Sequence, residues 1–171
     1  MPHAVINTPL GALTLFEEDG ALIAVEWGRA PDETSTPLLD IARDELDGYF
    51  DGRILRWSVP LRPAGSPFQV RAWQRLMQIP YGTTQSYGTL ARDLATSPRA
   101  IARACASNPI PIFIPCHRVV AAGGRLGGYS GGEGVDTERA LLRLEQAPLA
   151  DLEAAEYERQ AASTVVTGRE T

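Results

Sequence analysis

The first third of the chain shows strand-like and then helix-like spacing of its hydrophobic positions. Residues 3–27 alternate or run apolar around an Asp19-Gly20 turn, which predicts β-strands. In residues 36–50 (TPLLDIARDELDGYF) apolar side chains recur at helical spacing, and Asp51-Gly52 follows as a helix stop. Residues 54–61 (ILRWSVPL) predict one more strand. We therefore expect a small α/β lobe, and it holds no cluster of reactive side chains.

The next segment changes to a helical period. Ser66-Pro67 is a typical helix start, because serine caps a helix and proline suits its first position. Two short helices are predicted beyond it, at residues 85–94 and from Pro98 onward, with a tight turn at residues 95–97. This spacing is typical of a helix-turn-helix.

These patterns together predict an α+β protein. Residues 1–62 form the expected N-terminal α/β lobe, and residues 66–147 form a mostly helical C-terminal lobe that carries the helix-turn-helix. The last helix of that lobe is predicted to start with Asp136 or Thr137 as its cap. Residues 148–171 are rich in alanine and glutamate, and we expect a partly flexible tail.

Composition narrows the class of protein. The 171 residues are 44% hydrophobic and 22% charged, which is the balance of a water-soluble globular protein. No apolar run reaches the length of a membrane span, and the N-terminus lacks the features of a secretion signal, so we expect a cytoplasmic protein. Its two cysteines are too few for a disulfide framework or a four-cysteine zinc site, and we expect no metal.

The charge is unevenly distributed along the chain. The net charge is −5, which does not by itself indicate nucleic-acid binding. Residues 81–132, however, contain five arginines (Arg92, Arg99, Arg103, Arg118 and Arg125) and one acidic residue, Asp93. This segment could therefore form a positive face within an acidic protein.

The sequence FIPCHRVV places Cys116 next to His117 in an otherwise apolar run. A thiolate is a strong nucleophile, an imidazole can take the thiol proton, and a carboxylate can orient the imidazole. Adjacent side chains on a strand point to opposite faces, so the two residues can cooperate only if the chain bends near Pro115. Glu145 and Glu138 are the candidate carboxylates. From spacing alone, a functional pair and a buried structural cysteine remain equally good interpretations.

The run NPIPIFIPCHRVV, followed by GGYSGG, closely resembles the O6-alkylguanine-DNA alkyltransferase family over residues 66–145. The resemblance implies a ribonuclease H-like N-terminal lobe and direct repair of O6-alkylguanine in double-stranded DNA, with O4-alkylthymine as a further candidate lesion. After nucleotide flipping, the alkyl group would pass irreversibly to Cys116 in a single turnover. No cofactor, membrane or obligate protein partner is implied. We expect a monomer that joins a bacterial-type nucleoid during repair.

The resemblance also implies roles for the residues around the thiol. His117 corresponds to the base that deprotonates Cys116 through a water molecule. Glu145 corresponds to the carboxylate that orients His117, although a spacing two residues longer than the family pattern leaves Glu138 as the alternative. Asn108 corresponds to the hinge asparagine that bonds backbone near the reactive cysteine.

Two further groups of residues follow from the same resemblance. The alkylguanine pocket would be formed by Pro111, Val119, Tyr129, Ser130 and Gly131, with Ser130 offering its backbone N–H toward O6. The DNA-binding residues would lie in the helix-turn-helix: Ser86, Tyr87, Arg99, Ala100 and Arg103. Among them, Arg99 would fill the gap left by the flipped base, and Tyr87 would crowd the phosphate. Arg103 stands where the family commonly has glycine, so an exposed helix arginine is an equally good interpretation.

Two alternative functions remain at this point. A thiol hydrolase would use the same Cys116 and His117, but it would turn over repeatedly. A non-catalytic sensor of alkylated DNA would share the fold, but such proteins replace the reactive cysteine, which is intact here.

Overall fold

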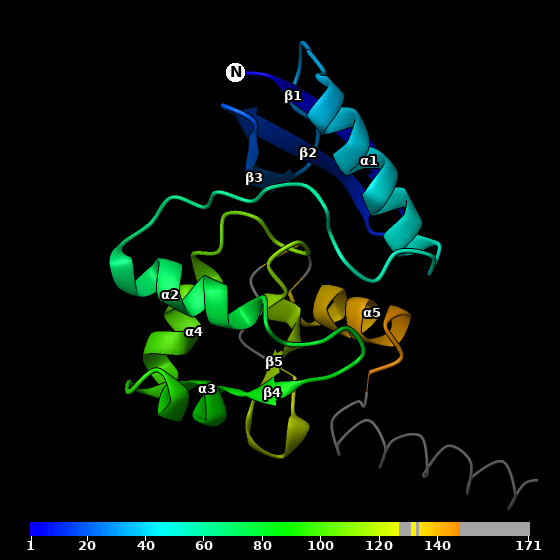
Figure 1. Cartoon of the computed structure of the whole chain (residues 1–171). Coiled ribbons are helices and arrows are strands. Elements are labelled where there is room, and N and C mark those ends of the chain that lie inside the picture. The colour runs from blue at the N-terminus through cyan, green and yellow to red at the C-terminus, as the bar shows by residue number, and fades with distance from the viewer. Residues whose placement is uncertain (127–130, 133, 148–171) are drawn as a thin grey trace, which may run out of the picture.

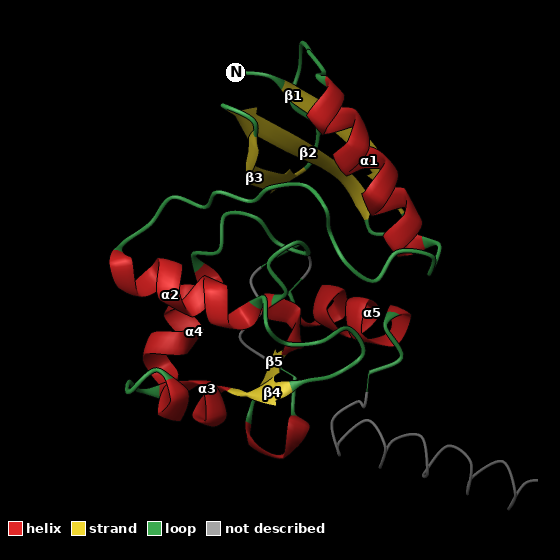
Figure 2. Ribbon diagram, viewed as in Figure 1, coloured by secondary structure: helices red, strands yellow, loops and turns green. Residues whose placement is uncertain are grey.

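The computed structural model describes residues 1–126, 131–132 and 134–147, which form two lobes joined by an extended segment (Figures 1 and 2). The N-terminal lobe contains a three-stranded antiparallel sheet in the order β1-β2-β3, with helix α1 packed on β1 and β2. Its elements are β1 (His3–Thr8), β2 (Gly11–Glu18), β3 (Ala21–Trp27) and α1 (Pro37–Phe50). The sheet and the helix confirm the predicted α/β lobe.

Local chemistry explains where these elements turn and end. Asp19 and Gly20 both have positive φ, 47° and 78°, and they connect β2 to β3 as the sequence predicts. The Thr36 side chain caps α1 by accepting a hydrogen bond from the backbone N–H of Leu39. The helix stops where Gly52 takes a φ of 75°, which a residue with a Cβ rarely adopts.

The prediction of a strand at residues 54–61 is wrong. In this segment only Leu61 takes part in a β-bridge, and the rest of the backbone runs irregularly. The Ser58 backbone N–H donates to the Glu45 carboxylate at 3.0 Å, so a side chain takes the place of a neighbouring strand. Pro60 has no N–H to offer to a ladder. The β-like composition was therefore overridden by tertiary contacts.

The C-terminal lobe is mostly helical and confirms the predicted α+β class. Helices α3 and α4 pack as the expected helix-turn-helix, and a short parallel pair, β4 with β5, lies beside them (Figure 1). The elements are α2 (Pro67–Leu76), β4 (Gln85–Ser86), α3 (Tyr87–Asp93), α4 (Pro98–Ala106), the 3-10 turn η1 (Cys116–Arg118), β5 (Val119–Val120), the 3-10 turn η2 (Ala122–Gly124) and α5 (Val135–Leu144).

Three helix starts in this lobe can be compared with the prediction. Ser66 caps α2 in a full capping box with Gln69, as the sequence indicates. Helix α3 begins two residues later than predicted, because residues 85 and 86 pair with β5. The expected cap at Asp136 or Thr137 is wrong, since Gly134 holds the N-cap position of α5 and both residues lie within its first turn.

One hydrophobic core connects the two lobes. It includes Leu15 of β2, Tyr49 of α1, Trp73 of α2 and Leu141 of α5, each at most 1% exposed. The backbone N–H of Val25 on β3 also donates to the carbonyl oxygen of Pro109 at 2.9 Å. Every residue from 110 to 120 is buried. The segment that carries the cysteine and histidine therefore lies at the junction of the lobes.

Candidate active site

The turn η1 gives the cysteine-histidine pair a bent backbone. Cys116 donates its backbone N–H to Ile114 at 2.8 Å, and Arg118 donates to Pro115 at 3.0 Å. The pair is not on a strand, so its side chains are not forced to opposite faces. Directly after the turn, β5 pairs with β4 at the start of α3, which ties the reactive turn to the helix-turn-helix.

The histidine is held by a buried carboxylate. His117 Nε2 lies 2.7 Å from Glu145 Oε2, and the two residues are 0% and 2% exposed. This geometry places the ring proton on Nε2 and leaves Nδ1 as the acceptor. Nδ1 has no hydrogen-bond partner within the described residues. Burial lowers the His117 pKa below its ordinary value, in spite of the opposing effect of Glu145, so the ring is neutral at neutral pH.

An arginine neutralises the same carboxylate. Arg118 donates from Nε to Glu145 Oε1 at 2.8 Å and from Nη2 to Glu145 Oε2 at 3.0 Å, while its Nη1 reaches the Ile79 carbonyl at 2.7 Å. Burial alone would raise the Glu145 pKa, but His117 and Arg118 hold it well below its usual range. Arg118 is only 7% exposed, so it does not belong to the positive face that the sequence suggested.

The thiol is held differently. Asn108 Nδ2 lies 3.2 Å from Cys116 Sγ and also donates to the Ile114 carbonyl at 2.9 Å. Its Oδ1 accepts from the backbone N–H of Ile110 at 2.9 Å, which fixes the orientation of the amide. Burial and the charge of Glu138 raise the Cys116 pKa to about 11, although the Asn108 hydrogen bond opposes them. The resting thiol is therefore protonated at neutral pH, and its reaction requires a base.

The two carboxylates that the sequence left as alternatives lie in different places. Glu145 ends α5 and contacts His117. Glu138 lies in the first turn of the same helix, is 0% exposed, and its charge acts on Cys116, Cys105 and Tyr87. Within the described part of the chain, Glu145 is therefore the carboxylate in hydrogen-bond contact with the imidazole.

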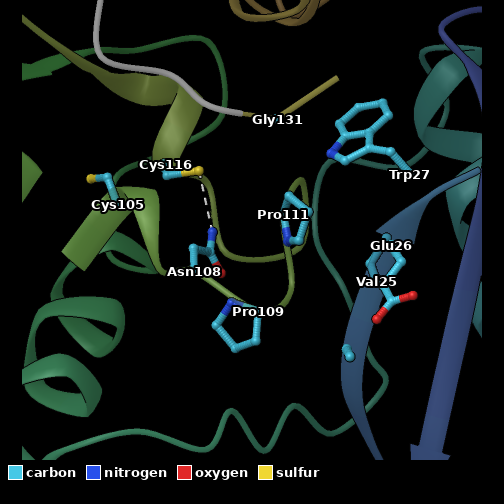
Figure 3. Close-up of a pocket in the computed structure, with 10 residues that line it drawn as sticks. Val25, Glu26, Trp27, Cys105, Asn108, Pro109, Pro111, Cys116 and Gly131 are labelled. Carbon is cyan, nitrogen blue, oxygen red and sulfur yellow. Dashed lines mark hydrogen bonds between the residues drawn. The ribbon is translucent and has the colours of Figure 1, made fainter. Parts of the chain in front are cut away.

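A cavity of about 540 Å³ opens beside the thiol (Figure 3). Cys116, Asn108, Pro111 and Gly131 line it, and so does a second buried thiol, Cys105. The opposite wall comes from β3 of the N-terminal lobe, and Figure 3 shows Trp27 and Glu26 across the gap from Pro111. The wall residues on β3 are Ala24, Val25, Glu26 and Trp27.

The predicted pocket residues divide into three groups. Pro111 and Gly131 line the cavity. Val119 is fully buried in β5 and does not appear on the cavity lining. Tyr129 and Ser130 lie outside the described residues. The contribution of β3 was not foreseen, because nothing in its pattern distinguishes a strand that faces a cavity from one that faces the core.

The predicted DNA-binding residues gather on the helix-turn-helix. Arg99 and Arg103 are exposed on α4, and Ala100 between them is half-buried. The Ser86 hydroxyl caps α3 by accepting from the Thr89 backbone at 3.0 Å. Tyr87 begins α3, and burial followed by the nearby charges of Cys105, Glu138 and Cys116 raises its pKa. Tyr87 is therefore a half-buried residue at the start of the helix-turn-helix.

Sequence reasoning missed two side chains of the hydrogen-bond network around Glu145. Arg118 was visible in the Cys-His-Arg triplet, but it was counted only as a surface charge. Tyr49, on α1 of the other lobe, donates its hydroxyl to Glu145 Oε2 at 2.5 Å, across 96 residues of sequence. No periodicity signals a contact over that separation. Among the described residues, no group of three or more His, Cys, Asp or Glu side chains could hold a metal ion.

Comparison with known proteins decides the family. Residues 67–147 match the model of the 6-O-methylguanine DNA methyltransferase DNA-binding domain, and residues 1–63 match that of the ribonuclease-like domain of the same proteins. A methylated-DNA–protein-cysteine methyltransferase of Mycobacterium tuberculosis is 39% identical over 153 residues, which covers 84% of this chain and 92% of the relative. The chain belongs to the 6-O-methylguanine DNA methyltransferase family.

Other members of this family agree in sequence and in fold. The constitutive methylated-DNA–protein-cysteine methyltransferase of Bacillus subtilis is 34% identical over 157 residues, covering 84% of this chain and 94% of the relative. The crystal structure of Mycobacterium tuberculosis OGT in complex with DNA aligns with a TM-score of 0.76 at 36% identity, covering 86% of this chain and 96% of that one. The Methanococcus jannaschii O6-methylguanine DNA methyltransferase gives a TM-score of 0.64 at 28% identity, with the same coverage of 86% and 96%.

Each of the two family domains contributes part of the site. The DNA-binding domain carries the reactive turn, the helix-turn-helix and Glu145. The ribonuclease-like domain carries Tyr49 and the β3 wall of the cavity. None of the helices in the described residues has the length and apolarity that crossing a bilayer requires.

Proposed function

We propose that this protein repairs DNA by transferring an alkyl group from O6 of guanine in double-stranded DNA to the sulfur of Cys116. The observation that carries the proposal is a thiol on the wall of a cavity, with an amide donor at 3.2 Å and a buried histidine-carboxylate pair next to it in the chain. Family membership and the DNA complex of the Mycobacterium tuberculosis relative support it. O4-alkylthymine is a further candidate lesion.

The chemistry is a single displacement at carbon. The Cys116 thiol gives its proton to Nδ1 of neutral His117, directly or through a water molecule, and Glu145 stabilises the imidazolium that forms. The sulfur then forms a bond to the alkyl carbon as the bond from that carbon to O6 breaks. The electron pair of the broken bond goes to the guanine, which takes back the proton. The thioether is stable, so each molecule reacts once.

Asn108 has a separate role in this scheme. Its N–H contacts the sulfur, and a hydrogen bond to an ionised group is stronger than one to the neutral group. The Asn108 amide therefore stabilises the thiolate more than the thiol, and lowers the barrier to its formation. Its own hydrogen bonds to Ile110 and Ile114 hold it in position before the lesion binds.

The helix-turn-helix would bring the lesion to the cavity. A base inside a duplex cannot reach a buried thiol, so the nucleotide has to rotate out of the stack. Arg99 would occupy the space it leaves, Tyr87 would crowd the phosphate, and Ser86 and Arg103 would contact the backbone. Binding through the minor groove suits a protein that accepts any sequence context. The acidic chain predicts a shallow salt dependence, because few phosphates are neutralised.

The reaction consumes a thiol, which suits a reducing compartment. Both Cys105 and Cys116 are free in the structure. We therefore place the protein in the cytoplasm, where thiols stay reduced. We propose that the protein acts as a monomer without a protein partner or cofactor, as the family resemblance implies.

The test is the intact mass of the protein after incubation with excess duplex that carries a single O6-methylguanine. We expect a gain of one methylene per molecule, never more than one, located at Cys116 by peptide mapping. Cys116→Ser should show no gain. The matched control is Cys105→Ser, which alters the other buried thiol of the same cavity and should still gain the methylene.

Two other outcomes would point to different functions. Binding to the lesion without a gain in mass would indicate a sensor, and the role given to Cys116 would be wrong. Release of more than one equivalent of product per protein would indicate a hydrolase. An unlesioned duplex of the same sequence serves as the reference for both measurements.

A further inference from the structure

Tyr49 connects the N-terminal lobe to Glu145, the carboxylate that holds His117. It lies near the end of α1, is 1% exposed, and donates its hydroxyl to Glu145 Oε2 at 2.5 Å. Its ring packs in an aromatic group with Phe50, Trp57 and Tyr81, with centroid distances of 5.2 to 6.1 Å. The contacts with these three rings therefore hold the Tyr49 ring in the position from which its hydroxyl reaches Glu145.

The same carboxylate oxygen serves three donors. Glu145 Oε2 accepts from Tyr49 Oη and from Arg118 Nη2 at 3.0 Å, and it lies 2.7 Å from His117 Nε2. One carboxylate oxygen offers about two lone-pair sites, so these donors compete for it. Removing the tyrosine hydroxyl would therefore strengthen the interaction between Glu145 and His117, and would stabilise the charged form of the imidazole.

The other ionisable groups around this pair are few among the described residues. Arg118 faces Glu145 from the reactive turn, and Tyr81 faces it from the segment after α2. Tyr81 directs its hydroxyl to the Leu144 carbonyl at 3.4 Å rather than to the carboxylate. Glu138 lies at the other end of α5, where its charge acts on Cys116. Among the described residues, Tyr49 is thus the neutral side chain that competes with His117 for Glu145 Oε2, while the Gly82 backbone N–H donates to Oε1.

We propose that Tyr49 is a positioning residue through which the N-terminal lobe keeps His117 uncharged and ready to accept the thiol proton. The inference rests on the alkyl transfer proposed above. In physical terms, the tyrosine shares the negative charge of Glu145, so that the carboxylate orients the imidazole without converting it to imidazolium in the resting protein. The burial that lowers the His117 pKa acts in the same direction.

The first test is the pH dependence of single-turnover methyl transfer for wild type and Tyr49→Phe. The reaction needs neutral His117, so its rate falls at acidic pH with the His117 pKa. We expect the midpoint of this acid limb to rise by about half a pH unit in Tyr49→Phe, because the imidazolium is better stabilised. The rate on the plateau above the limb should stay within about threefold of wild type. A merely structural role would lower the plateau and leave the midpoint in place.

The matched control is Tyr81→Phe. It makes the same change beside the same carboxylate, but it removes no hydrogen bond to Glu145. We expect its acid limb to coincide with that of wild type. The inference is overturned if Tyr49→Phe keeps the wild-type midpoint, or if Tyr81→Phe moves it equally.

A second measurement needs no reaction. The chain has only two histidines, His3 and His117, so the imidazole nitrogen resonances can be assigned with a His3→Gln variant. In a nitrogen-15 titration, Tyr49→Phe should raise the His117 pKa by about half a unit, and Tyr81→Phe should not. If wild type takes up no methylene while this shift is observed, the proposed function fails, and only the effect of Tyr49 on the His117 pKa stands. If methyl transfer is intact and the shift is absent, the proposed function stands and the role given to Tyr49 is wrong.

A third variant guards against loss of fold in Tyr49→Phe. Placing 3-fluorotyrosine at position 49 keeps the ring and hydroxyl but makes the hydroxyl a stronger donor. The competition with His117 should increase, and both the acid limb and the titration should move to lower pH. A shift to higher pH, or no shift, would contradict the inference.

Discussion

The two sides of the reactive turn are built in opposite ways. On the His117 side, the described residues direct several donors at one carboxylate: Tyr49, Gly82, His117 and Arg118. On the Cys116 side, the sulfur has Asn108 as its one side-chain donor within the described part of the chain, and it borders a cavity of about 540 Å³. His117 thus belongs to a closed polar network, whereas Cys116, its neighbour in the chain, borders an open pocket.

The difference follows from what each side has to do. A proton acceptor works best when its orientation and charge state are set before the substrate arrives, and a satisfied buried network provides that. A nucleophile has to be reached by the lesion, so it cannot be enclosed by donors. We therefore expect substitutions on the His117 side to affect stability as well as rate, and substitutions on the Cys116 side to affect mainly the rate.

The largest effect is expected for Glu145→Gln. It leaves the Arg118 guanidinium, 7% exposed, without its negative partner. Removing one member of a buried ion pair costs about 3–5 kcal/mol of unfolding free energy. Urea denaturation measures this loss, and Asp136→Asn, which changes an exposed carboxylate of α5, is the control that should alter the unfolding free energy little. A loss below about 1 kcal/mol for Glu145→Gln would show that the network is not what holds this side together.

Acid should remove part of the same stabilisation. The folded-state pKa of Glu145 lies below the ordinary carboxyl value of 4.5, so its contribution is present above that pH and is lost as pH falls through the folded pKa. The difference in unfolding free energy between wild type and Glu145→Gln should therefore shrink steadily below about pH 4.5. Urea titrations at several pH values give this difference directly. A difference that grows on acidification would contradict the assigned sign.

On the Cys116 side, Asn108→Ala should slow methyl transfer by about 10- to 100-fold. A hydrogen bond to a charged group contributes about 1.5–3 kcal/mol, and this one is strongest when the thiolate forms. Single-turnover kinetics with a methylated duplex measures the rate. Asn108→Asp provides a sharper comparison, because it keeps the volume and places a negative charge beside the sulfur. An Asp variant as fast as wild type would remove Asn108 from the mechanism.

Much of the fold was predictable because its signals are local. The Asp19-Gly20 turn, the Ser66 cap and the helix-turn-helix each depend on residues within a few positions of one another. The strand predicted at residues 54–61 does not form, because the Ser58 backbone N–H donates to the Glu45 carboxylate instead of to a neighbouring strand. Hydrophobic pattern predicts the tendency of a segment, and tertiary contacts decide its outcome.

The candidate site was predictable to the extent that it is contiguous. Cys116 and His117 are adjacent, and the resemblance supplied Asn108 and Glu145, which the structure brings to the same turn. Tyr49 and the β3 wall come from the other lobe, and no spacing rule relates them to the thiol. Apart from Arg118 and Cys105, which belong to the C-terminal lobe, the parts of the site that sequence reasoning missed exist only because the two lobes pack together.

The smallest expected effect concerns Glu138, whose charge raises the Cys116 pKa. In a Cys105→Ser background, Glu138→Gln should lower that pKa from its value of about 11 and increase the rate of Cys116 alkylation by iodoacetamide about two- to fivefold near neutral pH. The control is Asp136→Asn, which changes an exposed carboxylate in the same helical turn and should leave the rate as it is. A decrease in Glu138→Gln would mean that this carboxylate assists the thiolate instead of opposing it. In that case the Cys116 side would hold a second proton acceptor, and its contrast with the His117 side would be smaller than the hydrogen bonds suggest.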